Sequence, residues 1–197
     1  MKEYKLPIGC DVPETIILAD GDFPSHPLAL EWLRQCPYVV CCDGAANTYI
    51  RSGRMPEAIV GDGDSLLPDI KERYASLIHS EAEQETNDLS KAFRFCLSQE
   101  RKRITIMGAT GKREDHTIGN VSLLADYMEQ AEVSMMTDYG IFVPIREDSM
   151  FESYIGQQIS VFNMNSTALS AEGLAYPLSV FTNWWQGTLN EALARHF

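Results

Sequence analysis

The sequence predicts an α/β protein: a Rossmann-like, doubly wound and mostly parallel sheet, followed by a smaller all-β sandwich domain. Apolar runs without polar alternation recur as far as residue 137, and such runs are typical of strands covered on both faces. Segments with helical spacing of apolar residues separate these runs, which favours a parallel sheet between helices. Beyond residue 137 only short strand-like pieces follow, with turn residues between them.

The strands of the first part are expected where apolar runs stop at a turn. They are ETIILADG (14–21), YVVCCDGAA (38–46), AIVGDGDS (58–65), RITIMGATG (103–111) and VSMMT (133–137).

The helices are expected between these strands, and their ends carry recognisable signals. Pro68 suits a first helical turn, Thr86 or Asn87 suits an N-cap, and Gly53 suits a C-terminal cap. The expected helices are 26–35, 45–53, 68–78, 86–99 and 114–130.

The change of pattern after residue 137 predicts two domains, 1–137 and 138–197. The second contains IFVPI, QQISVFNM, ALSAEGLAYPLS and TNWWQGTL, and its single candidate helix is LNEALARHF (189–197). A domain of about 60 residues is marginally stable alone, so we expect contacts with the first domain or with a partner chain to stabilise it.

Composition excludes several classes of protein. The formal charge is −12, with 28 acidic and 16 basic residues, which argues against a nucleic-acid ligand because such binders need a basic surface. The five cysteines include no C-x-x-C pair, which is a poor basis for disulfides or zinc. We see no signal peptide and no apolar stretch long enough to span a membrane, so we expect a cytoplasmic protein without a membrane partner.

Polar residues gather just beyond the predicted strands. In open α/β sheets, ligands bind at the carboxyl ends of the strands, so these residues should meet on one rim. They are Asp20, Asp22, Asp43, Gly44, Asn47, Asp62, Asp64, Ser65, Gln84, Thr86, Asn87, Asp88, Thr110, Gly111, Lys112, Arg113, Asp115 and His116.

The stretch GDGDS sets Asp62 and Asp64 two residues apart. Carboxylates this close repel each other unless a cation or protons sit between them. Together with Asp88, and with Asp43 nearby, they offer the hard oxygen ligands that Mg²⁺ prefers. The alternative is a solvated Asp-Gly-Asp turn.

The stretch TGKREDH (110–116) predicts contact with phosphate. A glycine turn that opens a helix presents backbone N–H groups, and Lys112 and Arg113 add positive charge. The alternative is a solvated helix start. The sequence matches neither the EF-hand loop, nor the Walker loop, nor G-x-G-x-x-G.

Six motifs in order carry a resemblance to a known family. DGAAN (43–47), GDGDS (61–65), EQETND (83–88) and TGKREDH (110–116) are followed by EGLAYPL (172–178) and GTLNE (187–191). The chain resembles thiamine pyrophosphokinase over almost its whole length. The resemblance implies a catalytic N-terminal domain that binds nucleotide and magnesium, and a C-terminal thiamine-binding domain. It also implies a homodimer that holds thiamine between the catalytic domain of one subunit and the β-domain of the other.

The implied reaction transfers the terminal diphosphate of ATP to the hydroxyl of thiamine, giving thiamine diphosphate and AMP. By motif position, Mg²⁺ would be held by Asp62, Asp64 and Asp88, and the catalytic set adds Asp43 and Arg113. ATP contacts are expected at Asn47, Ser65, Thr110, Gly111, Lys112, Arg113, Asp115 and His116. Thiamine contacts are expected at Gln84, Tyr176, Trp185, Thr188 and Asn190.

The chain departs from the family pattern at two site positions. Lys112 replaces the usual second glycine of T-G-G-R-x-D-H, and Leu189 replaces the usual serine before Asn190. Two other functions stay open. One is a phosphohydrolase of the haloacid dehalogenase type, in which the first Asp of D-x-D is a nucleophile. The other is a non-catalytic thiamine- or nucleotide-binding module.

Overall fold

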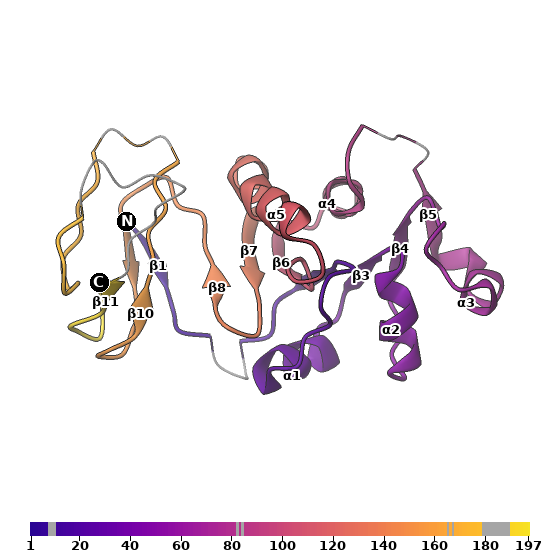
Figure 1. Cartoon of the computed structure of the whole chain (residues 1–197), viewed down its shortest axis with the longest axis horizontal. Helices are drawn as coiled ribbons and strands as arrows, with labels where there is room; N and C mark the ends of the chain where they lie inside the picture. The colour runs from indigo at the N-terminus through magenta and orange to yellow at the C-terminus, as the bar shows by residue number, and fades with distance from the viewer. Residues whose placement is uncertain (8–10, 82, 84, 165, 167, 179–189) are drawn as a thin grey trace. The chain divides into compact units, whose positions relative to one another are not determined.

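A mostly parallel sheet forms the centre of the larger of two units, Ile8–Pro144 (Figure 1). In the computed structural model the described residues are 1–7, 11–81, 83, 85–164, 166, 168–178 and 190–197. Within them the sheet has the strand order β5-β4-β3-β2-β6-β7-β8. The strands are β2 (Thr15–Leu18), β3 (Val39–Cys42), β4 (Ala58–Gly61), β5 (Ile78–Ser80), β6 (Arg103–Met107), β7 (Glu132–Met136) and β8 (Ile141–Phe142).

All neighbouring strands of this sheet run parallel except β8, which pairs antiparallel with β7. The mostly parallel α/β architecture that the sequence predicts is therefore present. Within the described part of the chain, the helices of this unit are α1 (Pro27–Gln35), α2 (Ala45–Arg51), α3 (Pro68–Arg73), α4 (Asp88–Ser98) and α5 (Glu114–Tyr127).

Two hydrophobic cores lie on opposite faces of the sheet. Side chains alternate along a strand, so β2 sends Ile17 to one core and Ile16 and Leu18 to the other. Helices α4 and α5 cover the face of Ile17, and α1, α2 and α3 contribute to the core on the opposite face (Figure 1). This burial on both faces explains the unbroken apolar runs.

One predicted helix is wrong in its second half. The segment 68–78 was expected to be helical throughout, but α3 ends at Arg73 and a 3₁₀ turn occupies Ala75–Leu77. Ile78 then begins β5 and pairs with Ile59 of β4. The parallel ladder to β4 satisfies the backbone here, and this long-range pairing overrides the local helical spacing.

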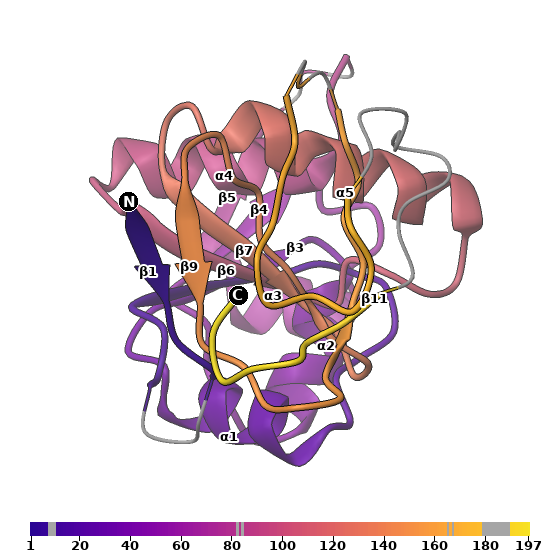
Figure 2. The same ribbon diagram turned by 90° about the vertical axis from the view of Figure 1, so that its left-hand side faces the viewer.

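The smaller unit joins both ends of the chain, Met1–Pro7 and Ile145–Phe197. Strand β1 (Lys2–Tyr4) pairs parallel with β9 (Ser149–Phe151), as Figure 2 also shows, and β10 (Gln158–Ile159) pairs antiparallel with β11 (Asn190–Glu191). The ring of Phe151 stacks on Tyr4 at 4.7 Å and on Phe197 at 5.2 Å between centroids.

The units divide the chain differently from the predicted boundary at residue 137. The first residues belong with the C-terminal part, and β8 belongs to the large sheet. The expected helix at 189–197 is also wrong within its described residues, 190–197. That segment pairs through β11 and through single bridges of Ala192 with Leu174 and His196 with Glu152. None of the helices in the described segments is long and apolar enough to cross a bilayer.

Candidate functional site

The strand order reverses at β2, whose neighbours are β3 and β6. Loops that leave these strands at their carboxyl ends therefore meet, and such a switch point is where open α/β sheets bind ligands. Backbone hydrogen bonds join the loops directly. Gly21 N–H donates to the Gly108 carbonyl at 2.6 Å, and Asp22 N–H donates to the Thr110 carbonyl at 2.8 Å.

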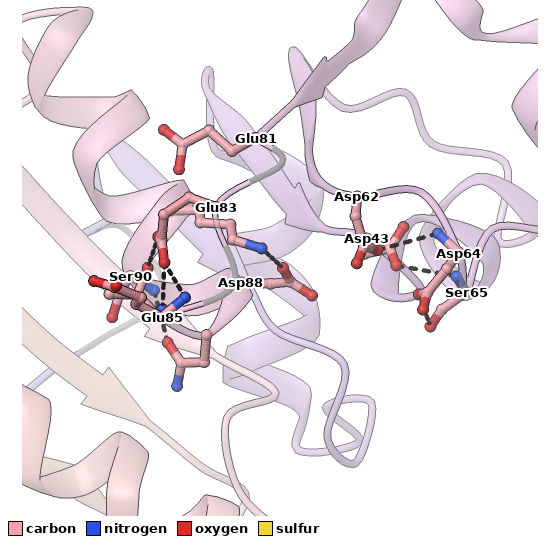
Figure 3. A network of polar contacts seen from close by, with 12 residues as sticks. Asp43, Asp62, Asp64, Ser65, Glu81, Glu83, Glu85, Asp88 and Ser90 are labelled. Atoms are coloured by element: carbon pink, nitrogen blue, oxygen red, sulfur yellow. Dashed lines mark hydrogen bonds and ion pairs between the residues drawn. The ribbon is translucent and has the colours of Figure 1, made fainter.

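Three carboxylates meet beyond β3 and β4. One oxygen from each of Asp43, Asp62 and Asp64 lies within 4.8 Å of the others (Figure 3). Asp43 is buried, with 3% of its surface exposed, whereas Asp62 and Asp64 are exposed. We call these three residues the acidic cluster.

Local backbone geometry brings the acidic cluster together. Asp43 adopts a positive φ of 29°, which is uncommon for a residue with a side chain. A Cβ atom at Gly61 would lie 2.8 Å from the Cβ of Asp43 and 3.4 Å from the Cγ of Asp88. Glycine at position 61 therefore allows the end of β4 to approach both carboxylates.

Hydrogen bonds hold the loop around the cluster. Asp43 Oδ2 accepts from Ser65 N–H at 3.1 Å, Asp62 Oδ1 accepts from Asp64 N–H at 3.2 Å, and Asp64 Oδ1 accepts from the Ser65 hydroxyl at 3.0 Å. Asn47 supports this loop, because its Nδ2 donates to the Ser65 carbonyl at 2.8 Å and its Oδ1 accepts from Leu67 N–H at 3.0 Å.

The second oxygen of Asp43 has unmet bonding capacity. Oδ1 is buried and has no hydrogen-bond partner among the described residues. Burial, together with the neighbouring carboxyl groups of Asp64, Asp88 and Asp62, raises the pKa of Asp43 to about 6, although the hydrogen bond from the Ser65 N–H opposes this rise. An orphaned buried oxygen beside two carboxylates fits a hard divalent cation such as Mg²⁺.

Asp88 lies beside Gly61 at the first turn of α4, and its Oδ1 accepts from Lys91 Nζ at 3.1 Å. The Lys91 side chain is only 4% exposed. Asn87 is the N-cap of α4, as expected, because its Oδ1 accepts from Ser90 N–H at 2.9 Å. Sequence reasoning missed Lys91, although a lysine three residues after Asp88 on the same helix was a usable signal.

The expected phosphate loop follows β6 and carries two consecutive left-handed residues, Gly111 at φ 79° and Lys112 at φ 57°. Lys112 is paired with Asp20. The Arg113 guanidinium donates to both oxygens of Asp115, at 3.1 and 2.6 Å, and this hydrogen-bonded pair holds the pKa of Asp115 below its usual range.

The expected thiamine residues fall in two groups. Asn190 is buried in the smaller unit, where its side chain donates to the Tyr176 carbonyl at 2.8 Å and accepts from Tyr176 N–H at 3.0 Å. The Tyr176 side chain is exposed. Gln84, Trp185 and Thr188 lie outside the described residues.

Fold and site together define an α/β protein with a cluster of three carboxylates at the carboxyl edge of a mostly parallel sheet. Comparison with known families makes the assignment more specific. Residues 29–136 match the thiamin pyrophosphokinase catalytic domain, and residues 140–197 match the thiamin pyrophosphokinase substrate-binding domain. The chain belongs to the thiamin pyrophosphokinase family.

Individual relatives agree with this membership. Thiamine pyrophosphokinase 1 of Oryza sativa subsp. japonica is 30% identical over 129 residues, covering 53% of this chain and 49% of that protein. Thiamine pyrophosphokinase of Bacillus subtilis (strain 168) is 34% identical over 86 residues, covering 42% of this chain and 40% of that protein. The chain thus spans about half the length of the first of these relatives.

Solved structures share the fold. Yeast thiamin pyrophosphokinase superposes with a TM-score of 0.75 at 17% identity, covering 99% of this chain and 86% of that one. Thiamin pyrophosphokinase from Candida albicans gives 0.74 at 17% identity, covering 99% of this chain and 87% of that one.

Proposed function

We propose that the chain is a thiamine pyrophosphokinase, which transfers the terminal diphosphate of ATP to the hydroxyl of thiamine and releases AMP. The observation that carries this proposal is the acidic cluster, in which Asp43 has a buried oxygen without a hydrogen-bond partner among the described residues, inside the segment that matches the family's catalytic domain. The relatives, which are named thiamine pyrophosphokinases, support the same activity.

Asp62, Asp64 and Asp88 would hold Mg²⁺, with Asp43 beside them in the acidic cluster. When bound, the ion neutralises charge on the phosphate oxygens. The reaction otherwise requires positioning and charge stabilisation rather than covalent chemistry by the protein. Lys91 fixes the Asp88 carboxylate, and Arg113 and Lys112 provide positive charge near the nucleotide.

We place the thiamine contacts in the smaller unit, at Tyr176 and Asn190 together with Trp185 and Thr188, and in the larger unit at Gln84. We also propose a homodimer, with thiamine held near the subunit interface. The smaller unit exposes several large apolar side chains, which a second copy of the chain would cover. They are Ile145, Tyr154, Ile155, Phe162, Met164, Tyr176 and Leu193.

Two finer assignments complete the proposal. The reversal of strand order at β2 supports a Rossmann-like description of the larger unit. The thiols of Cys36, Cys41, Cys42 and Cys96 are free, which suits a reducing compartment such as the cytoplasm.

The test is to incubate the purified chain with ATP, Mg²⁺ and thiamine and to resolve the products. Equal amounts of AMP and thiamine diphosphate are expected, and EDTA should abolish both. ADP with thiamine monophosphate would show attack at the γ-phosphorus and refute the proposed mechanism. Thiamine binding without any product would favour a binding module instead.

Replacement of Asp62 tests the cluster itself. Asp62→Asn should abolish transfer while leaving the circular dichroism spectrum and the melting temperature close to those of the parent, because Asp62 is exposed. Asp126→Asn, at an exposed carboxylate in the last turn of α5, is the matched control and should retain full activity. Unchanged turnover by Asp62→Asn, or its unfolding, would count against the assignment.

A further inference from the structure

We propose that Lys112 binds the polyphosphate of the nucleotide, and that Asp20 is the positioning residue that holds its ammonium group at the switch point. The inference rests on the proposed function, because that function identifies the ligand as a nucleotide. Asp20 was expected on the rim of the sheet, but it is not among the residues expected to bind metal, ATP or thiamine.

The contacts of Lys112 define the geometry. Its Nζ donates to the backbone carbonyl of Asp20 at 2.8 Å and to Asp20 Oδ1 at 3.0 Å. Both acceptors belong to one residue, so the ammonium group is held from one side. An ammonium group carries three N–H donors, and one therefore stays available for an anion.

The carboxylate of Asp20 lies close to the loop that follows β3. A Cβ atom at Gly44 would lie 2.8 Å from Asp20 Oδ2, so this oxygen lies against the backbone at the start of α2. Asp20 follows β2, Gly44 follows β3 and Lys112 follows β6. The ammonium group is consequently placed where the loops of three adjacent strands meet, which is the ligand position of such sheets.

Stability alone does not explain a lysine at this position. Lys112 has a φ of 57°, a left-handed conformation that costs a residue with a side chain roughly 1 kcal/mol. Its ion pair with Asp20 is exposed, at 53% and 49% of the two side chains, and exposed pairs contribute little to stability. Glycine would suit the backbone better, so the benefit of the lysine lies in what its ammonium group can bind.

The charges of the site point to an anionic ligand at Lys112. Arg113 uses two of its five N–H donors in the contact with Asp115, and the buried Lys91 donates to Asp88. The acidic cluster adds negative charge at the same rim. A polyphosphate that approaches these carboxylates needs cations with unused donors, and Lys112 is one that the loops hold at the switch point.

The backbone makes a clean experiment possible, because Lys112→Gly removes the ammonium group and relieves strain at the same time. Binding of MgATP would be measured by calorimetry without thiamine, so that turnover is not required. Lys112→Gly should weaken this binding about tenfold, since a hydrogen bond to a charged group is lost, while the melting temperature stays equal or rises. Lys112→Arg should retain most of the affinity, and Lys102→Ala, at the opposite end of β6, should be unchanged.

The role of Asp20 is tested by a double-mutant cycle. If Asp20 positions the ammonium group, Asp20→Asn should weaken MgATP binding, and adding Lys112→Gly to it should cost less than in the parent chain. Fully additive effects would refute the positioning role.

Steady-state kinetics separates binding from support of the fold. In Lys112→Gly the KM for ATP should rise while the KM for thiamine stays constant. Unchanged affinity for ATP would overturn the proposal, as would a lower melting temperature with both KM values raised. A parent chain that binds MgATP with this dependence on Lys112 but forms no thiamine diphosphate would refute the proposed function and leave the phosphate contact standing.

Discussion

At Asp43, a single carboxyl group combines an unusual backbone conformation, burial and two neighbouring carboxylates. Each of these features is unfavourable in the absence of a ligand. Residues of this kind persist when the surrounding structure enforces them, and here Gly61 and the loop to Ser65 do so. Binding of the proposed cation to these carboxylates would recover the free energy stored in this arrangement.

The substitution Asp43→Asn tests whether Asp43 destabilises the metal-free protein and contributes to cation binding. The neutral amide removes one negative charge, yet its Oδ1 can still accept from Ser65 N–H. Without metal, the variant should be more stable than the parent by about 1 kcal/mol, or roughly 2–4 °C in melting temperature. With Mg²⁺, the parent should gain stability and the variant much less. Thermal denaturation with and without Mg²⁺ measures both effects, and an equal Mg²⁺ shift in the two proteins would contradict the expectation.

At the scale of elements, Asp138 connects the turn between β7 and β8 to the start of α1. Its Oδ1 accepts from the backbone N–H groups of Ser25 and His26, both at 2.9 Å. His26 is the N-cap of α1. The hydrogen bond from the Ser25 hydroxyl and these N–H groups lower the pKa of Asp138 from its usual 3.8.

Asp138→Ala should lower the free energy of unfolding by about 1–2 kcal/mol, because these donors lose their acceptor. The folded-state pKa is depressed, so the contribution of Asp138 is present above its unfolded pKa and is lost as pH falls through the lower, folded value. Urea unfolding between pH 3 and 7 should show the difference between parent and variant shrinking below about pH 4. A difference that stays constant with pH would contradict this account. Asp126→Ala is the control and should change little.

The elements also show what could be predicted from sequence. β2, β3, β4, β6 and β7 each follow from a local apolar run, and the N-cap of α4 follows from Asn87. The edge strand β5 is too short for a local signal, whereas β8 lies in the strand-like piece IFVPI, which was expected in the second domain. The pairing of Lys2 with Ser149 joins the two ends of the chain, where no local pattern specifies a partner.

The candidate site, too, could be predicted from the sequence only in part. GDGDS identifies Asp62 and Asp64 because their spacing alone creates the repulsion that a cation relieves. The approach of Asp43 depends on the backbone at Gly61, and the pairing of Lys112 with Asp20 depends on the crossing of two loops. These two contacts depend on the three-dimensional arrangement of the loops, so the spacing of residues in the sequence does not predict them.

At the scale of the whole molecule, the smaller unit depends on the first seven residues. Deletion of Met1–Pro7 removes β1 from β9 and Tyr4 from the ring of Phe151. The strands of the large sheet all lie outside the deleted segment. The deletion should therefore preserve MgATP binding but abolish formation of thiamine diphosphate.

Calorimetry with MgATP and a product assay measure the two effects of this deletion. Glu3→Gln, an exposed position in β1, is the control and should leave both intact. Loss of MgATP binding in the deletion variant would show that the larger unit also needs these residues.

The pairing of β1 with β9 has a consequence for synthesis on the ribosome. Ile8–Pro144 is one continuous segment, so its sheet can form while the chain is still being made. Strand β1 is translated before that segment, but its partner β9 emerges only after it, on the order of ten seconds later at bacterial or eukaryotic elongation rates. During this interval the backbone of β1 is an unpaired strand, and such strands recruit other chains. Nascent copies should therefore aggregate most readily when translation stalls between Pro144 and Ser149.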